Sequence, residues 1–179
     1  MMAYFSESQL RSAASSYSMK KTASAHLLEA KASSKISIFL SHSSKDRILA
    51  QGFVITLGNL GYDVYVDWND SEMPRVTDKR TASILKERID ENSLFIVLAT
   101  RNAMASKWVP WEIGIADQMK GENSLLVVPV SHPNEGYYGS EYMALYKRIV
   151  ISDSRKAFVF DVGKNQDGSS LDNYMRIYG

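Results

Sequence analysis

The sequence predicts an α/β fold built on a doubly wound parallel sheet of five strands. Short apolar runs with little alternation, typical of strands buried on both faces, are separated by amphipathic stretches of helical length. Strand and helix alternate repeatedly, as in parallel sheets whose strands are joined by crossover helices. The five strands are expected at residues 36–40, 62–67, 94–99, 125–130 and 148–151, with a further edge element at 157–162.

Start and stop residues indicate where the helices lie. A polar loop at 41–46 offers N-caps for a helix over about 45–60, and Gly61 closes it. Ser106 is the expected N-cap of a helix that begins at about 107 to 110, because Pro110 is tolerated only in a first turn. The remaining helical segments are expected at 78–91, 140–146 and within 168–179.

The first 34 residues are rich in Ser and Ala and read as a helical N-terminal extension to a domain over 35–179. Ser6-x-x-Gln9 has the spacing of a capping box, and Leu27-Leu28 falls in a second helical stretch. The pattern leaves two roles open for the extension, namely oligomerisation or packing on the domain.

Composition excludes several classes of function. With 45% hydrophobic and 23% charged residues the chain is an ordinary globular protein, and its net charge of +1 shows no footprint for nucleic acid or an anionic membrane. The absence of cysteine removes thiolate chemistry, and the three histidines, at 26, 42 and 132, lack metal-ligand spacing. No apolar leader or membrane-length run is present. We therefore expect a cytoplasmic protein with no metal site.

Polar and aromatic side chains gather where a parallel α/β sheet binds its ligands, beyond the carboxyl ends of the strands. Trp108 and Glu112 begin the helix after the third strand, and their i, i+4 spacing brings an indole and a carboxylate to one side. The other residues at this rim are Ser41, His42, Ser43, Ser44, Asp67, Trp68, Thr100, Arg101, Ser131 and His132.

Other interpretations of these residues are weaker. No GxGxxG or Walker pattern is present. Asp67 ends a strand as receiver-domain aspartates do, but the acidic pair expected after the first strand is replaced by Ser41-His42. A triad of Ser41, His132 and Asp67 can be drawn, yet the chain lacks a GxSxG elbow. Glu112 also fits a plain role as an acid that complements the helix dipole, with both nearby tryptophans in the core.

Three blocks resemble the Toll/interleukin-1 receptor (TIR) domain family. They are Ile38-Phe39-Leu40-Ser41-His42-Ser43-Ser44-Lys45-Asp46, Leu60-Gly61-Tyr62-Asp63-Val64-Tyr65-Val66-Asp67, and the WxxxE segment Ser106-Lys107-Trp108-Val109-Pro110-Trp111-Glu112. The loop at 68–79 is similar to the family's BB loop but lacks its Gly-rich or Arg-Asp-x-x-Pro-Gly form. That departure favours a bacterial type, similar to TIR subunits of Thoeris-like anti-phage defence systems.

The resemblance implies a flavodoxin-like TIR fold and cleavage of the nicotinamide–ribose bond of NAD, which is substrate rather than cofactor, to give a linear or cyclic ADP-ribose signal. It assigns Glu112 to stabilising the oxocarbenium-like ribose and Trp108 to stacking on a ring. Ser41, His42 and Ser43 would contact ribose or phosphate, while Asp67 and Trp68 shape the opposite wall.

The implied partners are NAD, further TIR domains through self-association, and an effector that senses the nucleotide product. Two other functions stay open from the sequence. One is a TIR scaffold that assembles without chemistry, and the other is a nucleoside deoxyribosyltransferase-like enzyme that also relies on a lone glutamate.

Overall fold

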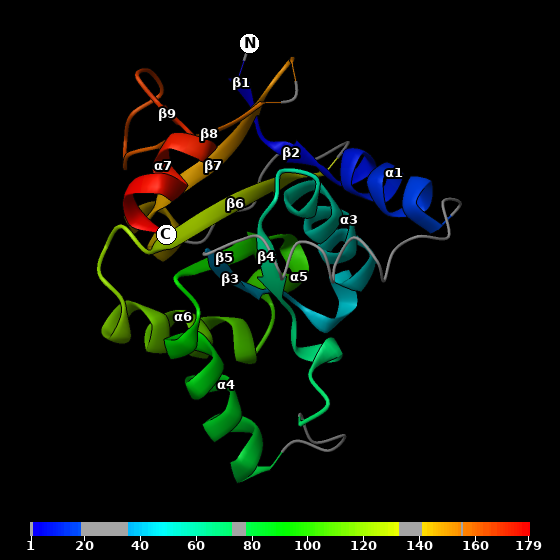
Figure 1. Ribbon diagram of the computed structural model, residues 1–179, viewed down its shortest axis with the longest axis vertical. Coiled ribbons are helices and arrows are strands. Elements are labelled where there is room, and N and C mark those ends of the chain that lie inside the picture. Colours follow the sequence, from blue (N-terminus) through cyan, green and yellow to red (C-terminus); the bar gives the residue numbers. More distant parts are fainter. Residues whose placement is uncertain (1, 19–35, 73–77, 133–140, 155) are drawn as a thin grey trace.

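Five parallel strands form the centre of the fold in a computed structural model that describes residues 2–18, 36–72, 78–132, 141–154 and 156–179 (Figure 1). The sheet order is β4-β3-β5-β6-β7, so the first central strand lies between the second and the third. This order confirms the predicted doubly wound sheet. The strands are β3 (Ser37–Ser41), β4 (Asp63–Tyr65), β5 (Leu94–Ala99), β6 (Leu125–Ser131) and β7 (Lys147–Ser152).

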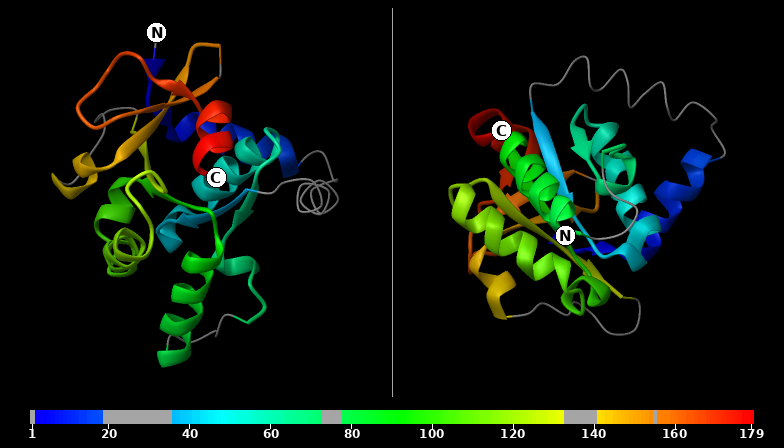
Figure 2. Two further views of the ribbon diagram at one scale, coloured as in Figure 1. Left: turned by 60° about the vertical axis from the view of Figure 1, so that its left-hand side comes forward. Right: turned by 90° about the horizontal axis from the view of Figure 1, so that it is seen from below.

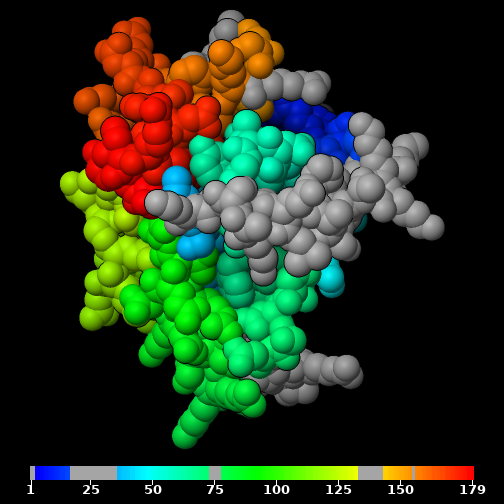
Figure 3. All heavy atoms as spheres, viewed as in Figure 1, coloured from blue at the N-terminus to red at the C-terminus, as the bar shows by residue number. Residues whose placement is uncertain are grey.

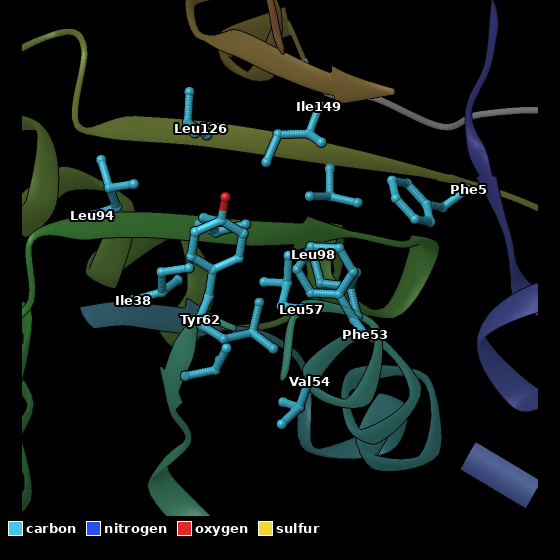
Figure 4. Packing of buried hydrophobic residues seen from close by; sticks show 14 of the residues in the cluster. Phe5, Ile38, Phe53, Val54, Leu57, Tyr62, Leu94, Leu98, Leu126 and Ile149 are labelled. Carbon is cyan, nitrogen blue, oxygen red and sulfur yellow. The ribbon is translucent and has the colours of Figure 1, made fainter. Parts of the chain in front are cut away.

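Helices cover both faces of this sheet because successive strand residues point to opposite sides. Ile38 and Leu40 of β3 pack with α3 (Arg47–Gly58) in one core cluster, shown in Figure 4, whereas Phe39 faces a second cluster. The second cluster contains residues of α4 (Lys79–Glu91) and α6 (Trp108–Met119). Four shorter segments lie in the loops: η1 (Ser44–Asp46), η2 (Asp67–Asn69), α5 (Arg101–Met104) and η3 (Glu141–Leu145).

Most of the residues predicted at helix starts and ends are confirmed there. Gly61 adopts a φ of 88°, the left-handed conformation that favours glycine after a helix. Lys107 rather than Ser106 holds the N-cap position of α6, but the Ser106 hydroxyl accepts hydrogen bonds from the first helix amides, those of Trp108 at 3.2 Å and Val109 at 3.4 Å. At α4 the Asp78 side chain caps the helix in a reciprocal capping box.

The sheet continues past β7 with antiparallel strands. β8 (Ala157–Phe160) pairs with β7 and with β9 (Ser169–Ser170), so the predicted edge element is an interior strand. The last helix, α7 (Leu171–Tyr178), lies against the segment before β4, as the red and teal surfaces in Figure 3 show. The Tyr62 hydroxyl fixes this contact by donating to Asp172 at 2.7 Å.

Residues 2–18 are part of the same folded unit. β1 (Met2–Ala3) pairs antiparallel with β7, β2 (Phe5–Ser6) pairs parallel with the end of β6, and α1 (Glu7–Ser18) packs beside α3 (Figure 2). Packing on the domain is thus one role of this segment. The second helical stretch near Leu27-Leu28 and the boundary at 34/35 lie outside the described residues.

Two contacts explain how the N-terminal segment that contains β2 and α1 lies so close to α3. Leu10 is buried, and its carbonyl oxygen would lie 2.0 Å from a Cβ at position 52, so only a glycine fits there. Phe5 packs edge-to-face on Phe53 with ring centroids 5.6 Å apart. The predicted capping box of α1 is confirmed by reciprocal bonds between Ser6 and Gln9 at 2.9 and 3.2 Å.

Among the described residues, no helix combines the length and the apolar composition needed to cross a membrane.

Candidate active site

Glu112 and Ser41 meet at the rim of the sheet although 71 residues separate them in the chain. Ser41 is the last residue of β3 and Glu112 lies in the second turn of α6, with exposed fractions of 1% and 8%. The Ser41 hydroxyl donates to Oε2 of Glu112 at 2.5 Å. The doubly wound topology therefore brings a carboxyl group and a hydroxyl donor together at the position where such sheets bind ligands.

Burial dominates the electrostatics of Glu112. It raises the pKa of the carboxyl group to about 7, and the negative charge of Asp67 acts in the same direction. The Ser41 hydrogen bond opposes both effects, because it favours the charged form. Within the described part of the chain, Ser41 is the single hydrogen-bond donor to this carboxyl group.

His42, Asp67 and Trp68 form a second group at the rim. Nδ1 of His42 lies 3.1 Å from the Leu40 carbonyl oxygen, and since a carbonyl only accepts, this nitrogen carries a proton. Nε2 lies 3.8 Å from Oδ1 of Asp67, and the ring packs edge-on to Trp68 with centroids 4.6 Å apart. The Arg47 guanidinium covers the Trp68 ring at 5.2 Å. The structure thus joins three of the predicted site residues.

The other two predicted residues make local contacts. Ser43 is buried, and its hydroxyl caps η1 by accepting from the Lys45 amide at 3.4 Å. Trp108 is half-buried and packs edge-on to Trp111 with centroids 5.3 Å apart, against the second core cluster. Its expected contact with a ring of the substrate beside Glu112 stays a prediction.

A second buried acid at the rim was missed from the sequence. Asp46 is 4% exposed and accepts from the Thr100 hydroxyl at Oδ2 and from the Asn102 amide at Oδ1, 2.6 Å away. The sequence predicts Thr100 at the rim, but it places Asp46 only in the helix-capping loop and in the first block of the family resemblance, without a partner. Its position after a Ser-rich loop gives no local signal of a partner 54 residues away.

A third acid fixes the loop that follows η2. Asp70 accepts from the Tyr65 hydroxyl at 3.0 Å, from Nε of Arg88 at 2.9 Å and from the Glu72 amide at 2.9 Å. Arg88 also pairs with the carboxylates of Glu72 and Glu91, so it fastens the loop to α4. Residues 73–77 of the predicted BB-like loop lie outside the described residues.

Away from this rim, the described residues line an open pocket of about 300 Å³ between the N-terminal segment and strands β7 and β8. None of its lining residues is a predicted site residue; they are Ala3, Tyr4, Arg148, Val150, Phe160 and Asn165. In the described ranges no group of three or more His, Asp or Glu side chains is placed to hold a metal ion.

Comparison with known proteins agrees with the fold. The family model of the TIR domain matches residues 38–160. The chain is similar to a probable 3′ cyclic ADP-D-ribose synthase, ThsB′, from Bacillus cereus (strain MSX-D12), with 40% identity over 63% of this chain and 59% of that protein. It is also similar to a putative cyclic ADP-D-ribose synthase, TIR2, from Cytobacillus dafuensis, with 26% identity over 53% of this chain.

The chain spans only part of these relatives, since the second match covers 29% of that protein's length. The family match, by contrast, covers more than half of this chain and includes β3, β4, β5, α6 and β6, the elements that build the rim. The chain belongs to the TIR domain family.

Proposed function

We propose that this protein cleaves the nicotinamide–ribose bond of NAD and closes the ADP-ribose part into a cyclic product, with Glu112 as the catalytic residue. The single observation that carries the proposal is the Glu112 carboxyl group itself. It is buried at the ligand-binding edge of the sheet, holds one hydrogen bond from Ser41 and has its pKa raised to about 7. A pKa near the working pH suits a group that must be charged at one step and take a proton at another.

The first step asks for charge stabilisation rather than an acid. When the bond between ribose C1′ and the nicotinamide nitrogen breaks, its electron pair stays on the nitrogen, and nicotinamide leaves as a neutral molecule. Positive charge then develops on C1′ and the ring oxygen of the ribose. A carboxylate in a water-poor site stabilises this charge strongly, because little solvent screens it.

The second step forms a new bond to C1′. A nucleophile from the same ADP-ribose molecule attacks for cyclisation, or water attacks for hydrolysis, and an attacking hydroxyl loses its proton. A carboxylate with a pKa near 7 can accept that proton and later release it to solvent. The two relatives are named as a probable and a putative cyclic ADP-D-ribose synthase, which favours cyclisation over hydrolysis.

The other predicted residues have supporting roles in this proposal. Ser41 orients the Glu112 carboxylate, His42 and Ser43 lie beside the ribose and phosphates, and Asp67 with Trp68 bounds the site next to His42. Trp108 shields the reacting carbon from water. The protein works in the cytoplasm, self-associates through its TIR domain, and supplies a nucleotide signal to a separate effector in anti-phage defence.

The test is incubation of concentrated protein with NAD, followed by mass spectrometry of the products. We expect free nicotinamide together with a product one water lighter than ADP-ribose. Glu112→Gln should lower nicotinamide release by about 10²-fold or more, the scale of losing a principal electrostatic stabiliser. The matched control is Asp117→Asn, which neutralises an exposed acid on the same helix and should leave the rate unchanged.

Equal rates for the wild type and Glu112→Gln would rule out Glu112 as the catalytic residue. NAD that stays intact while light scattering shows assembly would instead support a scaffold without chemistry. Exchange of free bases between deoxynucleosides would point to the deoxyribosyltransferase reaction.

A further inference from the structure

We propose that Asp46 is a positioning residue that holds the Ser41 hydroxyl against Glu112 by tying the loop after β3 to the loop after β5. The proposal rests on the proposed function, since it concerns the geometry of the catalytic carboxyl group. Asp46 itself would not touch the substrate.

The first step is that Asp46 is an anchored acid. It is 4% exposed, and each of its carboxylate oxygens accepts from a different side chain, Oδ2 from Thr100 and Oδ1 from Asn102 at 2.6 Å. The residue also begins α3, whose first-turn amides favour a negative charge. A buried carboxylate with these partners is held firmly, because any displacement leaves a charge unpaired in a dry environment.

The second step is that both ends of the segment 41–46 are fixed. Ser41 is paired in the sheet with Val97 of β5. At the other end, the Asp46 amide donates to the Ser43 carbonyl at 2.8 Å and closes a tight turn. The Asp46 side chain then fastens this turn to Thr100, just beyond the end of β5. Ser41 therefore has little freedom to move away from its acceptor.

The third step connects Asp46 to the helix that carries Glu112. The Thr100 hydroxyl that donates to Asp46 also accepts from the Ala103 amide at 3.0 Å, so it caps α5. The chain runs from α5 through Ser106 directly into α6. One side-chain cluster thus sets the spacing between the loop with the hydroxyl donor and the loop that leads to the acceptor.

This spacing matters because the Ser41 to Glu112 hydrogen bond, 2.5 Å long, is the single described interaction that favours the charged form of Glu112. The negative charge of Asp67 disfavours the charged form of Glu112. His42 is the neighbour of Asp67 on this side. If the cluster around Asp46 loosens, the hydrogen bond lengthens and the pKa of Glu112 rises further. Removing the Ser41 hydroxyl should change the pKa of Glu112 in the same direction.

The experiment measures the titration midpoint of the Glu112 carboxyl carbon by NMR in the full chain, with Glu112→Gln used to assign the signal. Thr100→Val removes the hydroxyl at nearly constant volume, whereas Thr100→Ser keeps it. We expect Thr100→Val to raise the midpoint by at least half of the rise caused by Ser41→Ala, and Thr100→Ser to leave it unchanged. Nicotinamide release at pH 7 should fall about twofold or more in Thr100→Val, since a smaller fraction of Glu112 is ionised.

Two further variants keep the test decisive. Asn102→Ala removes the second donor to Asp46 and should raise the midpoint even if Thr100→Val fails to fold. Ser170→Ala removes a comparable helix cap on α7, far along the chain from the rim, and should leave the midpoint unchanged.

An unchanged Glu112 midpoint in Thr100→Val and Asn102→Ala, with the Ser41→Ala rise intact, would overturn the positioning role. A rise in Ser170→Ala of the same size would also overturn it, because general destabilisation would then explain the effect. The NMR readout needs no substrate. A raised midpoint in a protein that leaves NAD intact would therefore support the positioning role while contradicting the proposed function.

Discussion

Two buried carboxyl groups lie at the same edge of the sheet, but they differ in their hydrogen-bond partners. Asp46 has a side-chain donor on each oxygen and sits at the start of α3. Glu112 is nearly as buried but holds only the Ser41 bond among the described residues, and its pKa is raised to about 7. A fully paired acid contributes stability, whereas a poorly paired one stores electrostatic free energy that a bound cationic ligand can release. The comparison teaches that hydrogen-bond partners, more than burial, distinguish these two acids.

The largest expected effect is on catalysis by Glu112. Beyond its loss of activity, Glu112→Gln should be more stable than the wild type at pH 8, by at most about 3 kcal/mol, because the charged form of Glu112 is disfavoured in the fold. The folded-state pKa lies above the unfolded one. The wild type therefore loses stability as the pH rises from the pKa of Glu112 in the unfolded chain towards about 7. The difference in the free energy of unfolding between the two proteins should grow over that range. Urea unfolding at pH 4 and pH 8 measures it.

Truncating the other acid should act in the opposite direction. Asp46→Ala leaves the Thr100 hydroxyl and the Asn102 amide without their acceptor in a buried environment, which costs about 1–3 kcal/mol. We expect lower stability at pH 8, measured by the same urea unfolding. A variant as stable as the wild type would show that Asp46 is not the anchored acid described above.

A smaller effect is expected when the donor to Glu112 is removed. Ser41→Ala takes away the hydrogen bond that lowers the pKa of Glu112, so the acid limb of the pH–rate profile should move to higher pH. Ser170→Ala is the matched control, because its hydroxyl caps α7 and does not bond to Glu112. Equal displacement of the limb in both variants would contradict the role given to Ser41.

The smallest effect is expected when the charge of Asp67 is removed. Asp67→Asn removes a negative charge that raises the pKa of Glu112, so the acid limb should move to lower pH. The shift should be slight, since the Asp67 side chain is 49% exposed and solvent screens its charge. Asp63→Asn, at the opposite end of β4, is the control and should leave the limb in place.

Local rules predicted much of this fold from the sequence. The continuous apolar run of β5, the capping box of α1 and the glycine after α3 each carry their signal within a few residues. The topology rule for parallel sheets then predicts Ser41, Asp67 and Glu112 at one edge of the sheet. The family match over residues 38–160 includes all three blocks that carry the family resemblance.

The parts that were missed depend on long-range contacts. β1 and β2 are two residues long, too short to show a period, and exist only because β7 and β6 offer free pairing positions. The hydrogen bond from Thr100 to Asp46 joins two loops that are distant in sequence. The sequence of the Ser-rich loop before Asp46 does not differ from that of an ordinary Ser-rich loop. The ring contact between Trp108 and Trp111 was not predicted, and the expected placement of Trp108 beside Glu112 stays a prediction.

The most direct test of the account is the pH dependence of nicotinamide release from NAD by the wild-type protein. If Glu112 works as a buried carboxylate, the rate should rise with pH through a midpoint of about 7, and this limb should vanish in Glu112→Gln. A rate that is flat between pH 5 and pH 8 would contradict the account, because the carboxyl group would then be ionised throughout, as an ordinary exposed glutamate is.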